Sequence, residues 1–342
     1  MCVGSAGQMI DRPLDQPVAC QIEFAGCDGT RLAGTLTLPR GTGQFPVVVA
    51  VHAAGGGTRD APLHRHLASF LPSLGVAALI YDRRGEGASD GRPGAPLTVL
   101  AGDVRAAVSV IALQPGVRAT RVGLWGHSQG GWIAPMAAAG NDMVAFLIVV
   151  AGSGVTPHEQ MIFATANLMR EAGYRQEHVA QATHLRNRLR ELRQDRGPLD
   201  RARLLLREAT AQPWYGLTYL PDPGSASDDG ALADEASFEW DLDISTTLSQ
   251  LRIPVLLSYG ETDRWVPIEP SIQAWRTALH RGHAPLTVSR LPGCGHFPTL
   301  ATDPADRDEA GPISPASSSS LRVGSTPWRC PDNEVRLPGW AC

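Results

Sequence analysis

The stretch Gly126-His127-Ser128-Gln129-Gly130 decides the fold, because of what stands on either side of it. The apolar run Arg121–Trp125 (RVGLW) precedes it, and the helix-like stretch Gly131–Ala139 (GWIAPMAAA) follows it. A serine between two glycines in this context is typical of a sharp turn that joins a strand to a helix. Backbone N–H groups and the helix dipole at such a turn favour developing negative charge. The pattern therefore predicts Ser128 as a nucleophile.

Further apolar runs are typical of strands buried on both faces, because they are rich in Val, Leu and Ile and lack polar alternation. They are Pro46–Val51, Val76–Tyr81, Ala145–Val150, Pro254–Tyr259 and Leu286–Leu291. Helical patterns lie between several of them, at Leu97–Leu113, Gly131–Ala139 and Pro270–Arg281. Alternating strands and helices favour a parallel sheet with right-handed crossovers.

The first strands are expected to differ from the rest. The runs Ala19–Phe24 and Leu32–Leu38 flank Asp28-Gly29, a dipeptide typical of a tight hairpin turn. The predicted fold class is therefore α/β, with a mostly parallel central sheet, an antiparallel leading hairpin and flanking helices.

The segment 155–249 breaks the alternation of strands and helices. It contains helical patterns at Glu159–Glu171, Gln176–Asp195 and Leu199–Ala209, and no run typical of a strand. We expect it to be a helical lid inserted into a core made of residues 18–154 and 250–300. Residues 301–342 are polar and rich in Pro and Ser, so we expect a poorly ordered tail. The candidate wall residues of the lid, for which ordinary packing inside the lid is the alternative, are Met161, Phe163, Met169, Trp214, Tyr215 and Tyr219.

The composition excludes several classes of function. The net charge of −4 is close to neutral, whereas a nucleic-acid-binding surface or a polybasic membrane anchor would need an excess of basic residues. All 30 basic residues are arginine, and the absence of lysine excludes a Walker-A loop, a protein-kinase ATP site and Schiff-base catalysis. No apolar run reaches the roughly 18 residues of a membrane span, and the first residues lack the pattern of a secretory signal. We therefore expect a cytoplasmic protein.

The cysteines do not indicate a metal site. The six cysteines are scattered along the chain, and none has the spacing of a zinc site. We expect free thiols, and neither a metal nor an organic cofactor.

A nucleophilic serine needs a base within hydrogen-bond reach, and that base needs an orienting carboxylate. Asp263 lies just after the predicted strand Pro254–Tyr259, and His296 lies just after the last predicted strand. Ligands of open α/β sheets bind at such strand ends. We therefore predict His296 as the base and Asp263 as the acid, with Glu261 as the rival acid.

The other histidines are expected to have no catalytic role. His127 lies inside the turn around Ser128, where a structural role is expected. Surface positions are expected for His64, His66, His158, His178, His184, His280 and His283.

Together these motifs resemble the α/β-hydrolase superfamily, in particular its bacterial esterase and dienelactone-hydrolase-like members. The resemblance covers about Val18 to Pro298. Besides the turn at Ser128, it rests on Val51–Gly56, Tyr81–Ser89, Gly260-x-x-Asp263 and Gly293-Cys294-Gly295-His296. It implies the α/β-hydrolase fold, in which nucleophile, acid and histidine follow one another in this order.

The resemblance also implies the roles of the site residues. Ser128 would be the nucleophile, His296 the general base and then the acid, and Asp263 its orienting carboxylate. The oxyanion hole would consist of the backbone N–H groups of Gln129 and Ala54. Members of this superfamily usually have His-Gly where this chain has His52-Ala53. The loop Asp82–Ser89 would be structural and not a dinucleotide-binding loop.

We therefore expect a serine hydrolase that cleaves a carboxylic ester of a small to medium, partly apolar substrate through an acyl-enzyme. The partner would be that small-molecule ester, with no nucleic acid and no membrane, and a homodimer is left open. One alternative is a thioesterase or acyltransferase of a biosynthetic pathway, where a thioesterase would also bind a carrier protein. The alternative from a different class is a catalytically inactive α/β-hydrolase-fold binding protein.

Overall fold

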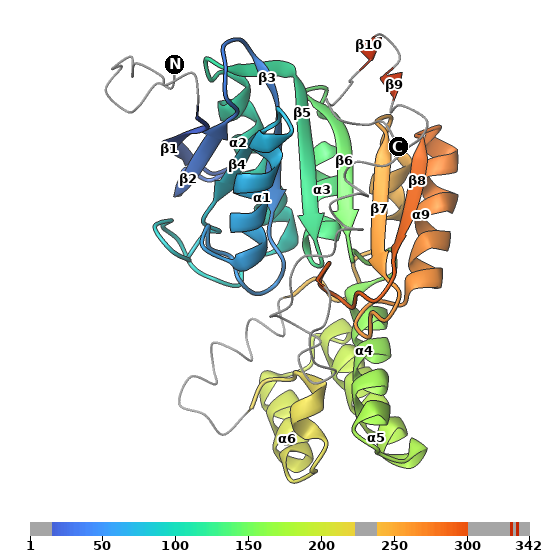
Figure 1. Cartoon of the computed structure of the whole chain (residues 1–342). Coiled ribbons are helices and arrows are strands. Elements are labelled where there is room, and N and C mark those ends of the chain that lie inside the picture. Colours follow the sequence, from blue (N-terminus) through green and yellow to red (C-terminus); the bar gives the residue numbers. More distant parts are fainter. Residues whose placement is uncertain (1–15, 223–237, 300–328, 331–332, 335–342) are drawn as a thin grey trace.

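The computed structural model describes residues 16–222 and 238–299, and the backbone of 329–330 and 333–334 (Figure 1). One eight-stranded sheet has the strand order β1-β2-β4-β3-β5-β6-β7-β8. Its strands are β1 (Val18–Ala25), β2 (Arg31–Leu38), β3 (Phe45–Val51), β4 (Ala77–Tyr81), β5 (Val117–His127), β6 (Val144–Val150), β7 (Val255–Gly260) and β8 (Leu286–Leu291). Strand β2 pairs antiparallel with β1 and with β4, and every later pair is parallel. The predicted fold class is confirmed.

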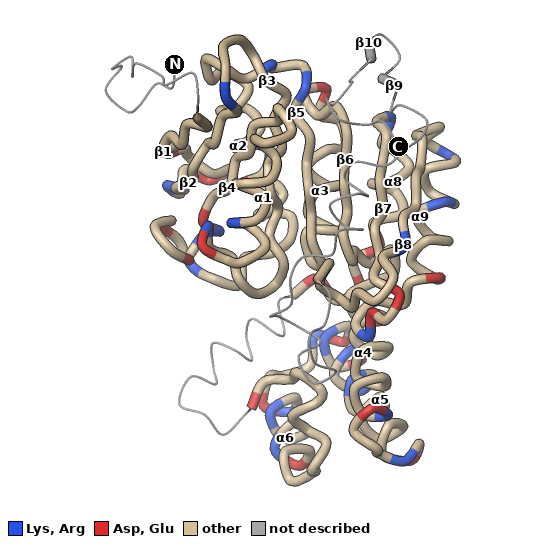
Figure 2. The backbone as a smooth tube through the Cα atoms, in the orientation of Figure 1, with Lys and Arg blue, Asp and Glu red and all other residues tan. Residues whose placement is uncertain are grey.

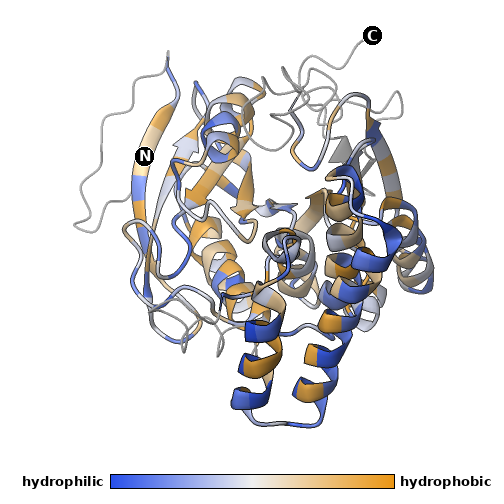
Figure 3. Ribbon diagram, turned by 90° about the horizontal axis from the view of Figure 1, so that it is seen from below, coloured by the Kyte–Doolittle hydropathy of each residue, from blue (hydrophilic) through white to orange (hydrophobic). Residues whose placement is uncertain are grey.

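The sheet is covered by helices on both faces. Side chains of α2 (Leu97–Ala112), α3 (Gly130–Ala138), α8 (Ser245–Ser249) and α9 (Ile268–Gly282) belong to one apolar cluster with the strands. Side chains of α1 (Pro62–Ser73) form a second cluster with residues of β3, β4 and β5. Burial on both faces explains why these strands are almost continuously apolar. Figure 3, which looks along the strands, shows helices with one apolar and one hydrophilic face.

The sequence does not predict α1. Its polar stretch His64-Arg65-His66 and the internal Pro72 obscure the helical spacing of Leu63, Leu67 and Leu71. The signals that could have shown it are Pro62 at the first helical turn and this leucine spacing.

A helical insertion separates β6 from β7. It contains α4 (Pro157–Glu171), α5 (Gln176–Gln194), α6 (Leu199–Thr210) and the short 3₁₀ helix η1 (Tyr215–Thr218). These helices share an apolar cluster of their own and lie beyond the carboxyl ends of the parallel strands (Figure 1). Both α5 and α6 carry acidic and basic residues (Figure 2), and ion pairs join Arg188 to Glu191 and Arg203 to Asp200.

The predicted tail 301–342 lies outside the described residues, except for two short antiparallel strands, β9 (Arg329–Cys330) and β10 (Asn333–Glu334). Within the described ranges, no helix is both long enough and apolar enough to cross a bilayer.

Two expectations about individual side chains are wrong. Cys27 and Cys294 are free thiols as expected, but Cys20 is disulfide-bonded. His64 and His158 are buried and not at the surface. Their rings lie 2.8 Å from the carbonyl oxygen of Thr58 and 3.0 Å from the side-chain oxygen of Asn187, respectively. Hydrogen-bond partners of this kind are what makes burial of a polar ring tolerable.

Candidate active site

The turn that follows β5 presents Ser128 in a strained backbone conformation. Its φ is +52°, in the left-handed region that residues other than glycine seldom adopt. The N–H of Ser128 donates to the carbonyl oxygen of Val150, at 3.0 Å, and α3 begins at Gly130. The serine therefore stands between a buried strand and a helix N-terminus, as the sequence predicts.

The glycines around Ser128 are required by the space available. A Cβ atom at Gly126 would lie 2.4 Å from the carbonyl oxygen of Gly130. A Cβ atom at Gly130 would lie 2.6 Å from the carbonyl oxygen of Val51, and one at Gly131 would lie 2.5 Å from Cα of Gly152. Each of these contacts is with backbone, which cannot move aside as a flexible side chain can.

We expect Gly130→Ala to lower the free energy of unfolding by about 1–3 kcal/mol, the usual cost of an overpacked interior. The reason is the clash of the new methyl group with Val51 at the end of β3. Gly216→Ala is the matched control, because a Cβ atom there would meet nothing within 4 Å. Thermal and urea unfolding of both variants measure the difference, and equal stability of the two would contradict this account.

The histidine after β8 lies between the serine and a carboxylate. Nε2 of His296 is 2.8 Å from Oγ of Ser128, and its Nδ1 is 3.0 Å from Oδ2 of Asp263. The other carboxylate oxygen, Oδ1, accepts hydrogen bonds from the backbone N–H groups of Trp265, at 2.8 Å, and Val266, at 3.1 Å. With Nδ1–H donating to Asp263, Nε2 is left free to accept the hydroxyl proton. The rival acid Glu261 is exposed, and the contact to His296 is made by Asp263.

A buried histidine next to Ser128 contacts the loop that carries His296. His127 lies with Nε2 3.0 Å from the carbonyl oxygen of His296. Burial lowers the pKa of His127 to about 3, so its ring is neutral near pH 7. A neutral ring can donate from Nε2 to this carbonyl, which agrees with the structural role expected from the sequence.

The two backbone N–H groups predicted for an oxyanion hole lie on neighbouring segments of the chain. Val51 pairs with Gly126 across β3 and β5, so the loop after β3 and the turn at Ser128 leave the sheet side by side. Gln129 is the N-cap residue of α3. Among the described residues, none accepts a hydrogen bond from the N–H of Gln129 or from that of Ala54. Neither group is therefore committed to another contact in the described part of the chain.

Trp265 and Phe297, which the sequence does not predict as site residues, lie beside the histidine. The rings of Trp265 and Phe297 lie 6.1 and 5.8 Å from that of His296. From the helical insertion, the exposed Tyr219 meets Trp265 edge to face, at 4.8 Å between ring centroids. The only signal of Trp265 and Phe297 in the sequence is their proximity to Asp263 and His296, whereas Tyr219 is one of the predicted wall residues.

The other wall candidates of the insertion differ in burial. Three of them pack in the apolar cluster of the insertion itself, which agrees with the alternative of ordinary packing. They are Met169, Trp214 and Tyr215. Met161 and Phe163 are half-buried on α4.

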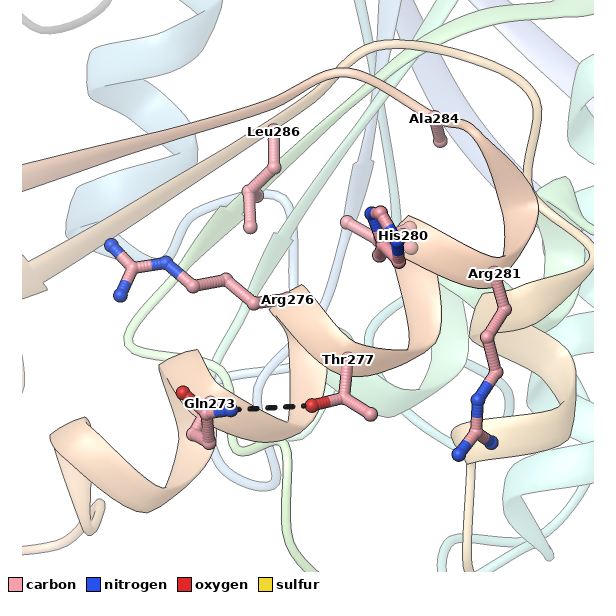
Figure 4. Close-up of a pocket in the computed structure, with 8 residues that line it drawn as sticks. Gln273, Arg276, Thr277, His280, Arg281, Ala284 and Leu286 are labelled. Carbon is pink, nitrogen blue, oxygen red and sulfur yellow. Dashed lines mark hydrogen bonds between the residues drawn. The ribbon is translucent and has the colours of Figure 1, made fainter.

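A cavity of about 570 Å³ lies along α9 (Figure 4). It reaches Leu286, the first residue of β8, whereas Asp263 and His296 follow the last residues of β7 and β8. It therefore lies at the opposite end of the sheet and does not contribute to the site at Ser128. Its lining residues are Gln273, Arg276, Thr277, Leu279, His280, Arg281, Ala284 and Leu286.

One group of side chains in the described part of the chain has the spacing of metal ligands. Cys27, Asp28 and Asp103 bring their ligand atoms within 4.8 Å of one another. However, the guanidinium of Arg84 donates to both carboxylates, at 2.7 and 2.8 Å to Asp103 and at 2.8 and 3.1 Å to Asp28. The two carboxylates of this group are therefore already paired with a cationic side chain.

Comparisons with known proteins agree with this fold. The model of the alpha/beta hydrolase family matches residues 48–307. The thiohydrolase apmlB of Arthrinium phaeospermum is 30% identical over 137 residues, which are 40% of this chain and 43% of that protein. The polyketide transferase claH of Penicillium crustosum is 30% identical over 132 residues, 38% of this chain and 43% of that protein. The matched segment thus spans less than half the length of these relatives. The structure of DcsB in complex with its substrate analogue has a TM-score of 0.54 and 20% identity, covering 82% of this chain and 91% of that one.

Proposed function

The chain belongs to the alpha/beta hydrolase family, and from that premise we propose that it is a serine hydrolase that cleaves a carboxylic ester through an acyl-enzyme. The observation that carries the proposal is the contact of His296 with both Ser128 Oγ, at 2.8 Å, and Asp263 Oδ2, at 3.0 Å. A nucleophile, a base and an orienting carboxylate in this order are the arrangement that acyl transfer requires.

In the proposed acylation, Oγ of Ser128 attacks the ester carbonyl carbon and Nε2 of His296 takes the hydroxyl proton. The carbonyl oxygen becomes an oxyanion held by the N–H groups of Gln129 and Ala54. Each such donor stabilises the transition state by about 3–4 kcal/mol. When the tetrahedral intermediate collapses, the bond to the alcohol oxygen breaks and His296 returns the proton to the leaving alcohol.

Deacylation repeats these steps with water as the nucleophile. His296 takes a proton from water, the hydroxide attacks the acyl carbon, and Oγ of Ser128 leaves with the proton from His296. Asp263 keeps its negative charge throughout and stabilises the imidazolium that forms in each step. Two backbone N–H groups on Asp263 Oδ1 hold the carboxylate in place for this purpose.

We propose that the helical insertion is a lid over this site and favours a partly apolar substrate. Support comes from its location beyond the strand ends (Figure 1) and from the contact of Tyr219 with Trp265, whose ring neighbours His296. Aromatic side chains at these positions would form an apolar wall for the acyl or the alcohol group.

The second candidate function is a thioesterase or acyltransferase that acts on an acyl thioester. It is favoured by the names of two relatives, a thiohydrolase and a polyketide transferase. The same nucleophile and base would serve, because only the leaving group, or the acceptor of the acyl group, differs. A thioesterase of this kind would also bind a carrier protein.

A matched pair of substrates tests the two candidates. A p-nitrophenyl ester and a coenzyme A thioester that carry the same acyl group are compared by kcat/KM over acyl chains of increasing length. We expect the ester to be turned over, with a preference for medium apolar chains. A strong preference for the thioester, or acyl transfer to an added alcohol in place of hydrolysis, would favour the second candidate. Turnover of neither would contradict both.

A further inference from the structure

Arg83, in the loop after β4, contacts the backbone of Ala53 and Ala54, where one N–H group of the proposed oxyanion hole lies. Nη1 of Arg83 donates to the carbonyl oxygen of Ala53, at 2.7 Å, and to that of Ala54, at 3.2 Å. Arg83 is 7% exposed, so its side chain is largely shielded from water. Its neighbour Arg84 points to Asp28 and Asp103 and makes no contact of this kind.

The same loop also holds the other end of this backbone segment. The N–H of Arg83 donates to the carbonyl oxygen of Gly57, at 2.7 Å. The N–H of Gly57 donates in turn to Oε2 of Glu86, at 3.1 Å. Residues 53–57 are therefore fixed at both ends by residues 83–86.

The segment Ala53–Gly57 needs such contacts because its sequence is Ala-Ala-Gly-Gly-Gly. Glycine loses more conformational freedom on ordering than any other residue, and Gly56 has a φ of +69°. An oxyanion hole stabilises a transition state only when its donors are fixed before the reaction begins. Without an outside contact, a loop of this composition would not hold a donor in one direction.

The geometry of the peptide bond links the contact between Arg83 and Ala53 to the direction of the N–H group of Ala54. In a trans peptide the C=O and the following N–H point in opposite directions. When Arg83 holds the carbonyl oxygen of Ala53, the N–H of Ala54 is directed away from Arg83. That N–H has no acceptor among the described residues, and its loop leaves the sheet beside the turn at Ser128.

The side chain of Arg83 is closely surrounded by other residues. A cavity of about 10 Å³ beside it is lined by Arg83, His52, Tyr81, Asp103 and others. That volume is close to the minimum for one water molecule, so the space beside Arg83 is small. The ring of His52 also lies against the end of β4, with Nε2 2.6 Å from the carbonyl oxygen of Tyr81.

We propose that Arg83 is a positioning residue of the oxyanion hole: by holding the carbonyl groups of Ala53 and Ala54 it aims the N–H of Ala54 at the carbonyl oxygen of the substrate. This inference rests on the proposed function, because it assigns a role within the same reaction. It predicts that loss of Arg83 affects the transition state more than it affects the bound substrate.

The test compares Arg83→Met and Arg83→Lys with Arg84→Lys as the matched control. We expect Arg83→Met to lower kcat by about 100-fold, a loss typical of one oxyanion donor, while KM changes less than about 2-fold. The affinity for an alkyl boronic acid, which adds Ser128 Oγ and mimics the tetrahedral intermediate, should fall in parallel with kcat. Arg83→Lys can reach one carbonyl oxygen and should recover part of the loss. Arg84→Lys should lower the melting temperature and leave kcat per folded molecule unchanged.

Amide hydrogen exchange gives a second readout that does not depend on turnover. Exchange of the peptide that covers residues 53–57 should be faster in Arg83→Met or Arg83→Lys than in the wild type, and unchanged in Arg84→Lys. The inference is overturned if the folded Arg83 variants keep the wild-type kcat and boronate affinity, or if their loop exchanges at the wild-type rate. If the wild type turns over neither ester nor thioester, the proposed function fails, and exchange still decides whether Arg83 holds the loop.

Discussion

Replacement of Ser128 by alanine is expected to reduce kcat for ester hydrolysis by about a million-fold, the loss typical of removing the nucleophile of such a site. The reason is that Ser128 Oγ is the atom that forms the acyl bond. His296, Asp263 and the backbone N–H groups only assist the formation and cleavage of this bond. Single-turnover and steady-state hydrolysis of the best p-nitrophenyl ester measure the effect.

A comparison of stability separates this loss from misfolding. The hydroxyl contributes a hydrogen bond to His296 but fills almost no volume beyond the methyl group of alanine. Ser128→Ala should therefore melt within a few degrees of the wild type. A folded variant that retains a tenth or more of the wild-type kcat would contradict the assignment of Ser128.

Asp263→Asn is expected to lower kcat by about ten-thousand-fold, with a nearly unchanged structure. An asparagine can keep one oxygen in contact with the N–H groups of Trp265 and Val266. Its NH₂ group would then face Nδ1 of His296, where a donor cannot replace the acceptor. The histidine would be held in the wrong tautomer, with a proton on Nε2, and could not accept the hydroxyl proton of Ser128.

Glu261→Gln is the matched control for this prediction. Glu261 lies two residues before Asp263 in the same loop and is exposed. We expect the variant to keep the wild-type kcat and its pH profile. A large loss in Glu261→Gln together with a small loss in Asp263→Asn would reverse the assignment of the acid.

Most of the sheet is predictable from the sequence, because a strand buried on both faces requires an apolar run of the kind seen at Val47–Val51 and Val255–Tyr259. The glycines around Ser128 are predictable for a similar reason, since each close backbone contact leaves room for no other residue. Helix α1 is not predicted because its packing against β3 and β4 overrides the polar residues and the internal Pro72.

The candidate site divides in the same way. Ser128, Asp263 and His296 are predictable because each follows a strand, and parallel strands bring their carboxyl ends to one edge. The contacts of Arg83 with Ala53 and of Tyr219 with Trp265 are not predictable, because each joins segments distant in the sequence. The disulfide of Cys20 is missed for a related reason, since cysteine spacing alone does not reveal a pairing partner.

The central claim is that Ser128 is an activated nucleophile, and covalent labelling tests it most directly. The full chain is treated with a fluorophosphonate probe, and the modified residue is located by peptide mass. The account predicts stoichiometric labelling of Ser128 that is absent in Ser128→Ala. Labelling of a different residue, or no labelling of the folded wild type, would contradict it.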